Sequence, residues 1–235
     1  MSFSAEKSLG ERGYEKTRFA PLHFSLEEIK YRFDKDIEVL KNQFETVLVL
    51  ESQQKHREAQ DVLRSQIVFC EGVFDFFLHE VSKLVAFELF TEQRKPVDSF
   101  SNIKLTLNVG ELKYLLGSEK TEEDFYTIVN SKFSAETYMS RDNLSTQLKI
   151  IGVSFKDVLK DTFGSVAKGK NFLQDFHIRR NQIAHQMDRS HLNSEQTPID
   201  SQYVKNCIDN ISNLSDSIFS KLTSNHCKRL RINVP

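Results

Sequence analysis

The sequence predicts an all-α protein, a helical bundle with additional short helices and an N-terminal extension. Helix breakers are scarce, with 8 Gly and 4 Pro among 235 residues. Long stretches repeat apolar side chains at steps of three and four, which marks one buried face of a helix. One run, residues 103–109, alternates apolar and polar residues instead, but no partner strand is visible and a lone strand is unstable.

The composition is that of an ordinary folded chain without a strong charge bias. Apolar residues make up 39% and charged residues 28%, and the net charge is −1. Contact with nucleic acid would therefore have to come from a local basic patch. The length suits one domain with a real core, which we expect over residues 25–224. Residues 1–24 are predicted to be an N-terminal arm, and residues 225–235 a basic tail.

Several features favour a cytoplasmic protein. The cysteines, Cys70, Cys207 and Cys227, show no paired spacing, which suits a reducing compartment. The N-terminus is charged and lacks the apolar core of a signal peptide. The most apolar window, residues 67–90, is interrupted repeatedly by charged residues, so no membrane span is expected.

Two long helices are predicted in the first part of the chain. The first begins at Ser25, which forms a capping box with Glu28. Its buried face comprises Ile29, Phe33, Ile37, Leu40, Phe44, Val47 and Leu48. Residues 51–60 form a polar bend or an exposed continuation, and a second helix follows over residues 62–90. That helix should be central, because apolar residues cover so much of its girth. Its core face is Leu63, Ile67, Cys70, Phe74, Phe77, Val81, Leu84 and Val85, widened by Val68, Phe69, Val73, Phe76 and Leu78.

Three short segments lie in the middle of the chain. An extended connector leads into a short helix at residues 111–116. Thr121 with Asp124 is predicted to cap the next helix. A further helix over residues 143–151 should end at Gly152, because glycine readily adopts the conformation that stops a helix.

The C-terminal third contains a short helix, the helix with the polar motif, and a long last helix. Ser154 with Asp157 caps the short one, which ends before a loop predicted at residues 164–170. The last helix is predicted to begin at the Thr197–Pro198 pair, since proline suits the first helical position. Its helically spaced apolar residues are Ile199, Tyr203, Cys207, Ile211, Leu214, Ile218 and Leu222.

Residues 172–188, FLQDFHIRRNQIAHQMD, combine an apolar stripe with a concentration of polar side chains. Projected at about 100° per residue, Arg180 falls inside that stripe. An arginine there is costly unless an acid pairs with its charge. Glu71 and Asp75, four apart on the central helix, are the candidate acids. The stripe itself is formed by Phe172, Phe176, Ile183 and Met187.

Asn181 and His185 are four residues apart and therefore stack on one face, away from Arg180. These residues fit a structural interpretation, in which the arginine meets a buried acid and the other two lie at the surface, as well as a functional one. A metal site is not expected, because His177 and His191 flank the motif at spacings that match no zinc pattern. No cofactor is expected either.

The string RRNQIAHQ at residues 179–186 resembles the signature of the HEPN superfamily, the higher eukaryotes and prokaryotes nucleotide-binding domains. That signature is an Arg, a polar residue and then a His on a late helix of an α-helical bundle. Arg180, Asn181 and His185 match it, with four residues between the Arg and the His. The resemblance covers roughly residues 60–222. The segment LRSQIVFCEGVFDFFLHEV resembles the early core helix of the family, and LSTQLKIIGVSF followed by the motif helix is similar to the RiboL-PSP type of HEPN domain.

The resemblance implies a HEPN-type bundle and a metal-independent endoribonuclease, a hydrolase that acts as a toxin or antiphage-defence effector. Metal-free RNA cleavage needs a base for the ribose 2′-OH, an acid for the leaving oxygen and a cation for the phosphorane charge. His185 can serve as acid or base near neutral pH. Arg180 can grip the phosphate, and Asn181 can hold the histidine ring or a phosphate oxygen.

One histidine per chain is a small acid–base set, and the resemblance implies that a homodimer places two motif helices at one cleft. Arg179, Arg189, Lys168 and Lys170 are expected to line an RNA groove there, or else to be ordinary solvated surface. The expected partners are RNA, a second copy and an antitoxin or defence-system protein. The alternatives are a non-catalytic HEPN module that binds a nucleotide or a partner protein, and a purely structural helical dimer.

Overall fold

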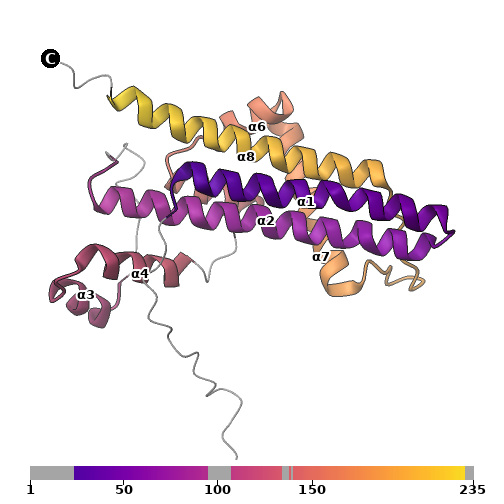
Figure 1. Ribbon diagram of the computed structural model, residues 1–235, viewed down its shortest axis with the longest axis horizontal. Helices are drawn as coiled ribbons and strands as arrows, with labels where there is room; N and C mark the ends of the chain where they lie inside the picture. The colour runs from indigo at the N-terminus through magenta and orange to yellow at the C-terminus, as the bar shows by residue number, and fades with distance from the viewer. Residues whose placement is uncertain (1–23, 95–106, 134–137, 139, 231–235) are drawn as a thin grey trace, which may run out of the picture.

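The computed structural model describes residues 24–94, 107–133, 138 and 140–230, and this part of the chain forms eight helices and no strand (Figure 1). The predicted all-α fold is therefore confirmed. The helices are α1 (Leu26–Ser52), α2 (His56–Phe90), α3 (Val109–Leu116), α4 (Thr121–Phe133), α5 (Arg141–Ile150), α6 (Phe155–Phe163), α7 (Val166–Gln186) and α8 (Ser201–Leu230).

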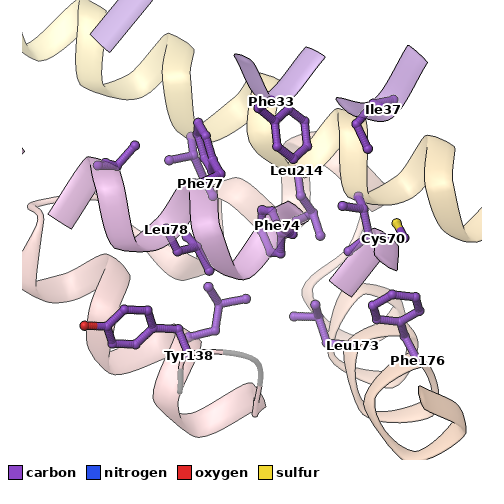
Figure 2. Close-up of a cluster of buried hydrophobic side chains, with 14 of the residues drawn as sticks. Phe33, Ile37, Cys70, Phe74, Phe77, Leu78, Tyr138, Leu173, Phe176 and Leu214 are labelled. Atoms are coloured by element: carbon purple, nitrogen blue, oxygen red, sulfur yellow. The ribbon is translucent and has the colours of Figure 1, made fainter. Parts of the chain in front are cut away.

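Helix α2 is the centre of the bundle, as its broad apolar surface predicted. It packs against α1, α4, α7 and α8. Figure 1 shows α1, α2 and α8 lying lengthwise beside one another, with α3 and α4 below one end of α2. Phe74 and Phe77 of α2 meet Phe33 of α1, with ring centroids 6.4 and 5.1 Å away, and Leu214 of α8 joins them (Figure 2). Within the described ranges, no helix is long and apolar enough to cross a bilayer.

The polar stretch at residues 51–60 contains the turn between α1 and α2. The predicted capping box is present, because the Ser25 hydroxyl accepts from the backbone of Glu28 while the Glu28 carboxylate accepts from the backbone of Ser25. Helix α1 ends at Ser52, and Gln54 takes a left-handed φ of 60° in the tight turn. Helix α2 then begins at His56, before the predicted start.

Three apolar residues predicted to be buried lie at the surface. Leu48 is 64% exposed, Phe69 56% and Phe76 50%. The two phenylalanines share the outer face of α2 with Gly72, and none of the described helices covers that face. Apolar periodicity showed which face of the helix is hydrophobic, but it could not show that no described helix covers part of that face.

Helices α3, α4 and α5 lie close to their predicted positions but begin at other residues, whereas α6 is capped by Ser154 as predicted. Asn108 caps α3 with Glu111, and Ser140 caps α5. Thr121 is the first residue of α4 and not its cap, because the Asp124 amide donates to the Lys120 carbonyl while the Thr121 hydroxyl donates to the Ser118 carbonyl. The part of the predicted connector up to residue 106 lies outside the described residues, as does the arm up to residue 23.

Helix α8 begins at Ser201, three residues later than the Thr197–Pro198 pair predicted. Asp200 caps it by accepting a hydrogen bond of 2.8 Å from the backbone of Tyr203. The helix runs to Leu230, so its last turns include the first residues of the stretch considered a basic tail.

Helix α7 begins earlier than predicted, because residues 166–170 are helical and not a loop. The Ser165 hydroxyl caps it by accepting from the backbone of Lys168 at 3.1 Å. Gly169 permits α6 to approach closely, since a Cβ there would lie 2.8 Å from side-chain atoms of Leu159 and Phe163. The glycine that suggested a loop therefore serves helix packing.

The C-terminus of α7 is closed by two consecutive residues in the left-handed region. Met187 and Asp188 have φ values of 52° and 59°, and the Asp188 amide donates to the Gln182 carbonyl at 3.0 Å. This reversal turns Met187 outward, where it is 65% exposed, so its predicted place in the apolar stripe is wrong.

The same reversal directs Asp188 into the protein. Its Oδ2 accepts from Arg64 Nε of α2 at 3.0 Å and from Arg179 Nη2 of α7 at 2.8 Å. Arg64 also donates to the Thr197 carbonyl at 2.9 Å. Asp188 thus ties the end of α7 and the following loop to α2.

The Asp188→Asn variant should lose about 3 kcal/mol of unfolding free energy, because the buried Arg64 and the partly buried Arg179 lose the buried carboxylate that they share. Urea unfolding measures the change. The matched control is Asp209→Asn, which removes an exposed pair with Lys41 and should cost less than about 1 kcal/mol. Equal losses in both variants would contradict a buried role for Asp188.

Two helical glycines should respond oppositely to alanine. Gly169→Ala should destabilise the protein by about 1–3 kcal/mol, since the new methyl overlaps α6. Gly72→Ala should stabilise a single chain by up to about 1 kcal/mol, because alanine favours a helix and no atom lies within 4 Å of its Cβ. Urea unfolding at low protein concentration tests both, and a shift of the same sign in both would contradict the packing at α6.

Candidate functional site

The candidate site lies where α2 and α7 pass each other in opposite directions. Arg64 near the start of α2 contacts Asp188 beyond the end of α7, whereas Glu71, two turns further along α2, contacts His177 and Arg180. Glu71 is only 2% exposed, and it is the acid that pairs with Arg180 where α2 packs against α7.

Three side chains close a ring with this buried carboxylate. Arg180 Nε pairs with Glu71 Oε2, and Arg180 Nη1 donates to Asn181 Oδ1 at 3.0 Å. Asn181 Nδ2 lies 3.0 Å from His177 Nε2, and His177 Nδ1 lies 3.1 Å from Glu71 Oε1. We call Glu71, His177, Arg180 and Asn181 the Glu71 ring.

The chemistry of the Glu71 ring assigns every donor in it. Arginine only donates, so the Asn181 oxygen must face Arg180 and its NH₂ must face His177. His177 Nε2 therefore accepts, and the ring proton of the neutral imidazole is on Nδ1, donated to Glu71. The network thus orients both Asn181 and His177.

The charge on Glu71 is opposed by its surroundings and supported by its partners. Burial raises the pKa of the Glu71 carboxyl, while the hydrogen bond from His177 and the charge of Arg180 act to lower it. The nearby Asp75 carboxylate raises the pKa further. The Glu71 carboxylate is therefore a buried charge that two specific donors, His177 and Arg180, hold in place.

Asp75, the other candidate acid, has different partners. Its Oδ1 accepts from the backbone of Tyr138 at 3.1 Å, and its Oδ2 lies 3.3 Å from His79 Nε2. The rings of His79 and Tyr138 contact each other at an interplanar angle of 45°, with centroids 4.5 Å apart. Asp75 thus anchors the segment before α5, although it also borders the site.

An open pocket of about 300 Å³ lies over the Glu71 ring, between α2, α5 and α7. Arg180 reaches it with a side chain that is 31% exposed. Arg180 Nη2 has no partner in the described part of the chain and remains available to an anion in the pocket. The pocket is lined by Glu71, Gly72, Asp75, Ser140, Asn143, His177, Arg180 and Asn181.

His185 lies outside the Glu71 ring, on the exposed face of α7. It is one turn beyond Asn181, at a Cβ separation of about 5–6 Å for this spacing. Asn181 bonds backward to His177 and not forward to His185. Among the described residues, no hydrogen bond or ion pair holds the His185 ring, so the imidazole is open to an approaching group.

The four basic residues predicted to line an RNA groove are dispersed. Arg179 is bound to Asp188 and to the carbonyls of Thr197 and Pro198, and it is structural. Arg189 donates to the Ser194 carbonyl at 2.7 Å and closes the loop after α7. Lys168 and Lys170 lie in the first turns of α7, away from the Glu71 ring, and Lys170 borders a separate pocket.

His177 is the site residue that sequence reasoning missed, because it was tested only for zinc spacing. The signal was available in part, since His177 precedes Asn181 by four residues and so shares its face. In the described part of the chain, no cluster of three or more His, Cys, Asp or Glu could hold a metal ion.

A comparison with protein families found one match that covers most of the chain. The model of one family, described as RiboL-PSP-HEPN, matches residues 29–224, from α1 into α8. The matched range includes the Glu71 ring and His185. A search of curated proteins and a search of solved structures found no match.

The pKa of Glu71 predicts how stability depends on pH. A folded-state pKa raised above 4.5 means that the folded state binds the proton more tightly, so this contribution to stability is complete below 4.5. It is lost as the pH rises through the folded-state pKa. Relative to Glu71→Gln, the wild type should therefore lose unfolding free energy from acidic to neutral pH, measured by urea unfolding.

Glu38→Gln is the control with the opposite sign. A hydrogen bond from Lys35 lowers the pKa of the exposed Glu38, so its contribution is present above 4.5 and lost as the pH falls. The same direction of pH dependence for both glutamates would contradict burial as the dominant influence on Glu71.

Proposed function

The chain belongs to the RiboL-PSP-HEPN family, and on that premise we propose that it is a metal-independent endoribonuclease, a toxin or antiphage-defence effector of the cytoplasm. The observation that carries the proposal is the position of His185. It is exposed, no described group holds its ring, and it lies one turn from the arginine and asparagine of the Glu71 ring. An acid–base group must reach the substrate, and His185 is free to do so.

The Glu71 ring supports this function by holding Arg180 in place. Its Nε and Nη1 are engaged by Glu71 and Asn181, which leaves Nη2 to bind a phosphate oxygen. A guanidinium fixed before the substrate arrives needs little reorganisation when negative charge develops on the phosphorane. Asn181, oriented by His177, borders the same pocket.

The proposed reaction uses one histidine from each of two copies. His185 of one copy removes the proton from a ribose 2′-OH, and the 2′-oxygen attacks the adjacent phosphorus. Arg180 stabilises the charge on the phosphorane oxygens. His185 of the second copy donates a proton to the departing 5′-oxygen. The bond between phosphorus and that oxygen breaks, giving a 2′,3′-cyclic phosphate and a 5′-OH.

Exposed apolar residues support a homodimer around this site. Ile178, 46% exposed, lies two turns before His185 on the outer part of α7. On α2, Phe69 and Phe76 flank Gly72, whose missing side chain leaves room for close approach. Exposed apolar groups of this kind favour a protein partner. Under this proposal a second copy covers them, and an antitoxin or defence-system protein would act on the assembled dimer.

His185→Ala should lower the rate of RNA cleavage by on the order of 10²–10⁴, because one residue supplies both the base and the acid of the dimer. The measurement is cleavage of total RNA with EDTA present. His191→Ala, an exposed histidine on the loop after α7, is the control and should cleave as the wild type does. Intact RNA with the wild-type protein, with and without added metals, would contradict the proposal.

The pocket over the Glu71 ring also favours a second candidate, a non-catalytic module that binds a nucleotide. Its volume of about 300 Å³ and its mixture of charged and amide groups suit a small polar ligand. Calorimetry with nucleotides separates the two, because tight nucleotide binding without RNA cleavage supports the binding module.

A further inference from the structure

A second pocket, of about 420 Å³, lies between α5, α6 and α7. Three helices each contribute one lysine to it: Lys149 from α5, Lys156 from α6 and Lys170 from α7. We call it the lysine pocket. Lys170 was among the basic residues expected to meet RNA, whereas Lys149 and Lys156 did not stand out in the sequence.

The lysine pocket carries an excess of positive charge. Asp142 is its one acidic lining residue, and in the described part of the chain none of the three lysines forms an ion pair or a hydrogen bond. By contrast, Lys41 and Lys221 elsewhere on the surface pair with acids at 2.8 and 2.6 Å. Like charges gathered in one pocket repel one another unless an anion lies between them.

The start of α6 adds to this field. Phe155 and Lys156, its first two residues, border the pocket, and their backbone amides precede the first hydrogen bond within the helix. The positive end of the helix dipole therefore faces the same space as the lysines. A phosphate group matches this combination of ammonium groups and backbone N–H donors.

The lysine pocket and the Glu71 ring lie along one side of α7. Lys170, His177, Asn181 and His185 fall within an arc of about 80° when projected at 100° per residue. Lys170 precedes His185 by about 22 Å along the helix axis. Helix α5 borders both pockets, because Asn143 lines one while Ser145 and Lys149 line the other.

We propose that the lysine pocket binds a backbone phosphate of the RNA at a distance from the cleaved bond, so that a single strand lies along α7 from Lys170 to His185. This inference rests on the proposed ribonuclease function and deepens it, by giving the enzyme a phosphate subsite outside the catalytic groups. A strand that reaches both places must be on the order of four nucleotides or longer.

The test is binding of a fluorescent single-stranded oligodeoxynucleotide, which lacks the 2′-OH and is not cleaved. The variant Lys149→Gln, Lys156→Gln, Lys170→Gln should bind at least about tenfold more weakly, with a salt dependence shallower by about 0.7 for each phosphate that is no longer bound. The control Lys55→Gln, Lys113→Gln, Lys120→Gln removes the same charge from exposed lysines outside both pockets and should bind as the wild type does. Equal binding by the two triple variants, or no binding by the wild type, overturns the proposal.

Two further measurements separate this inference from the proposed function. In cleavage assays, the pocket variant should raise KM for a long RNA while leaving kcat/KM for a dinucleotide unchanged. If cleavage depends on His185 but the pocket variant binds the oligonucleotide normally, the RNA subsite in the lysine pocket is overturned and the ribonuclease function stands. Cleavage that is absent or independent of His185 overturns the ribonuclease. The lysine pocket could instead bind free phosphate, which calorimetry with inorganic phosphate tests. If free phosphate binds tightly and the lysine substitutions leave oligonucleotide binding unchanged, the RNA subsite is overturned.

Discussion

The burial of the Glu71 carboxylate is the constraint on which the site depends. A lone carboxylate between α2 and α7 would cost several kcal/mol, so the sequence must supply partners at that depth. Arg180 supplies charge and His177 a hydrogen bond, and Asn181 joins these two to close the ring. Each member has its orientation fixed by the next, and removal of any one leaves a polar atom at the seam without its partner.

Together with Asp188, the Glu71 ring sets the register of α7 against α2. Arg64 and Glu71 are two turns apart on α2, and each binds a group on or just beyond α7. Because the two contacts lie on either side of His185 in the chain, α7 cannot slide or rotate without breaking a buried charge contact. The helix is thus held firmly where its exposed face presents His185, which explains how a side chain that no described residue binds occupies a defined place.

Patterns local in sequence predicted the fold well, and contacts between distant residues account for what was missed at the site and on the outer face of α2. The capping pairs at Ser25 and Ser154 could be predicted because all their atoms lie within one turn. The need of Arg180 for an acid followed from its place in an apolar stripe. The role of His177 did not, since it depends on Glu71, 106 residues away. Likewise, Phe69 has the spacing of a core residue and is exposed only because no described helix covers it.

Under the proposed ribonuclease function, the division of the site into a fixed arginine and an unheld histidine has a consequence for catalysis. Arg180 is oriented within a single chain, whereas an imidazole acting as acid or base also needs a group that sets its direction. In the described part of the chain no such group reaches His185, and under the proposed function the RNA or a second copy would set its orientation. Assembly and substrate binding would then complete the catalytic geometry, and the isolated chain would keep its phosphate-binding parts ready without being active.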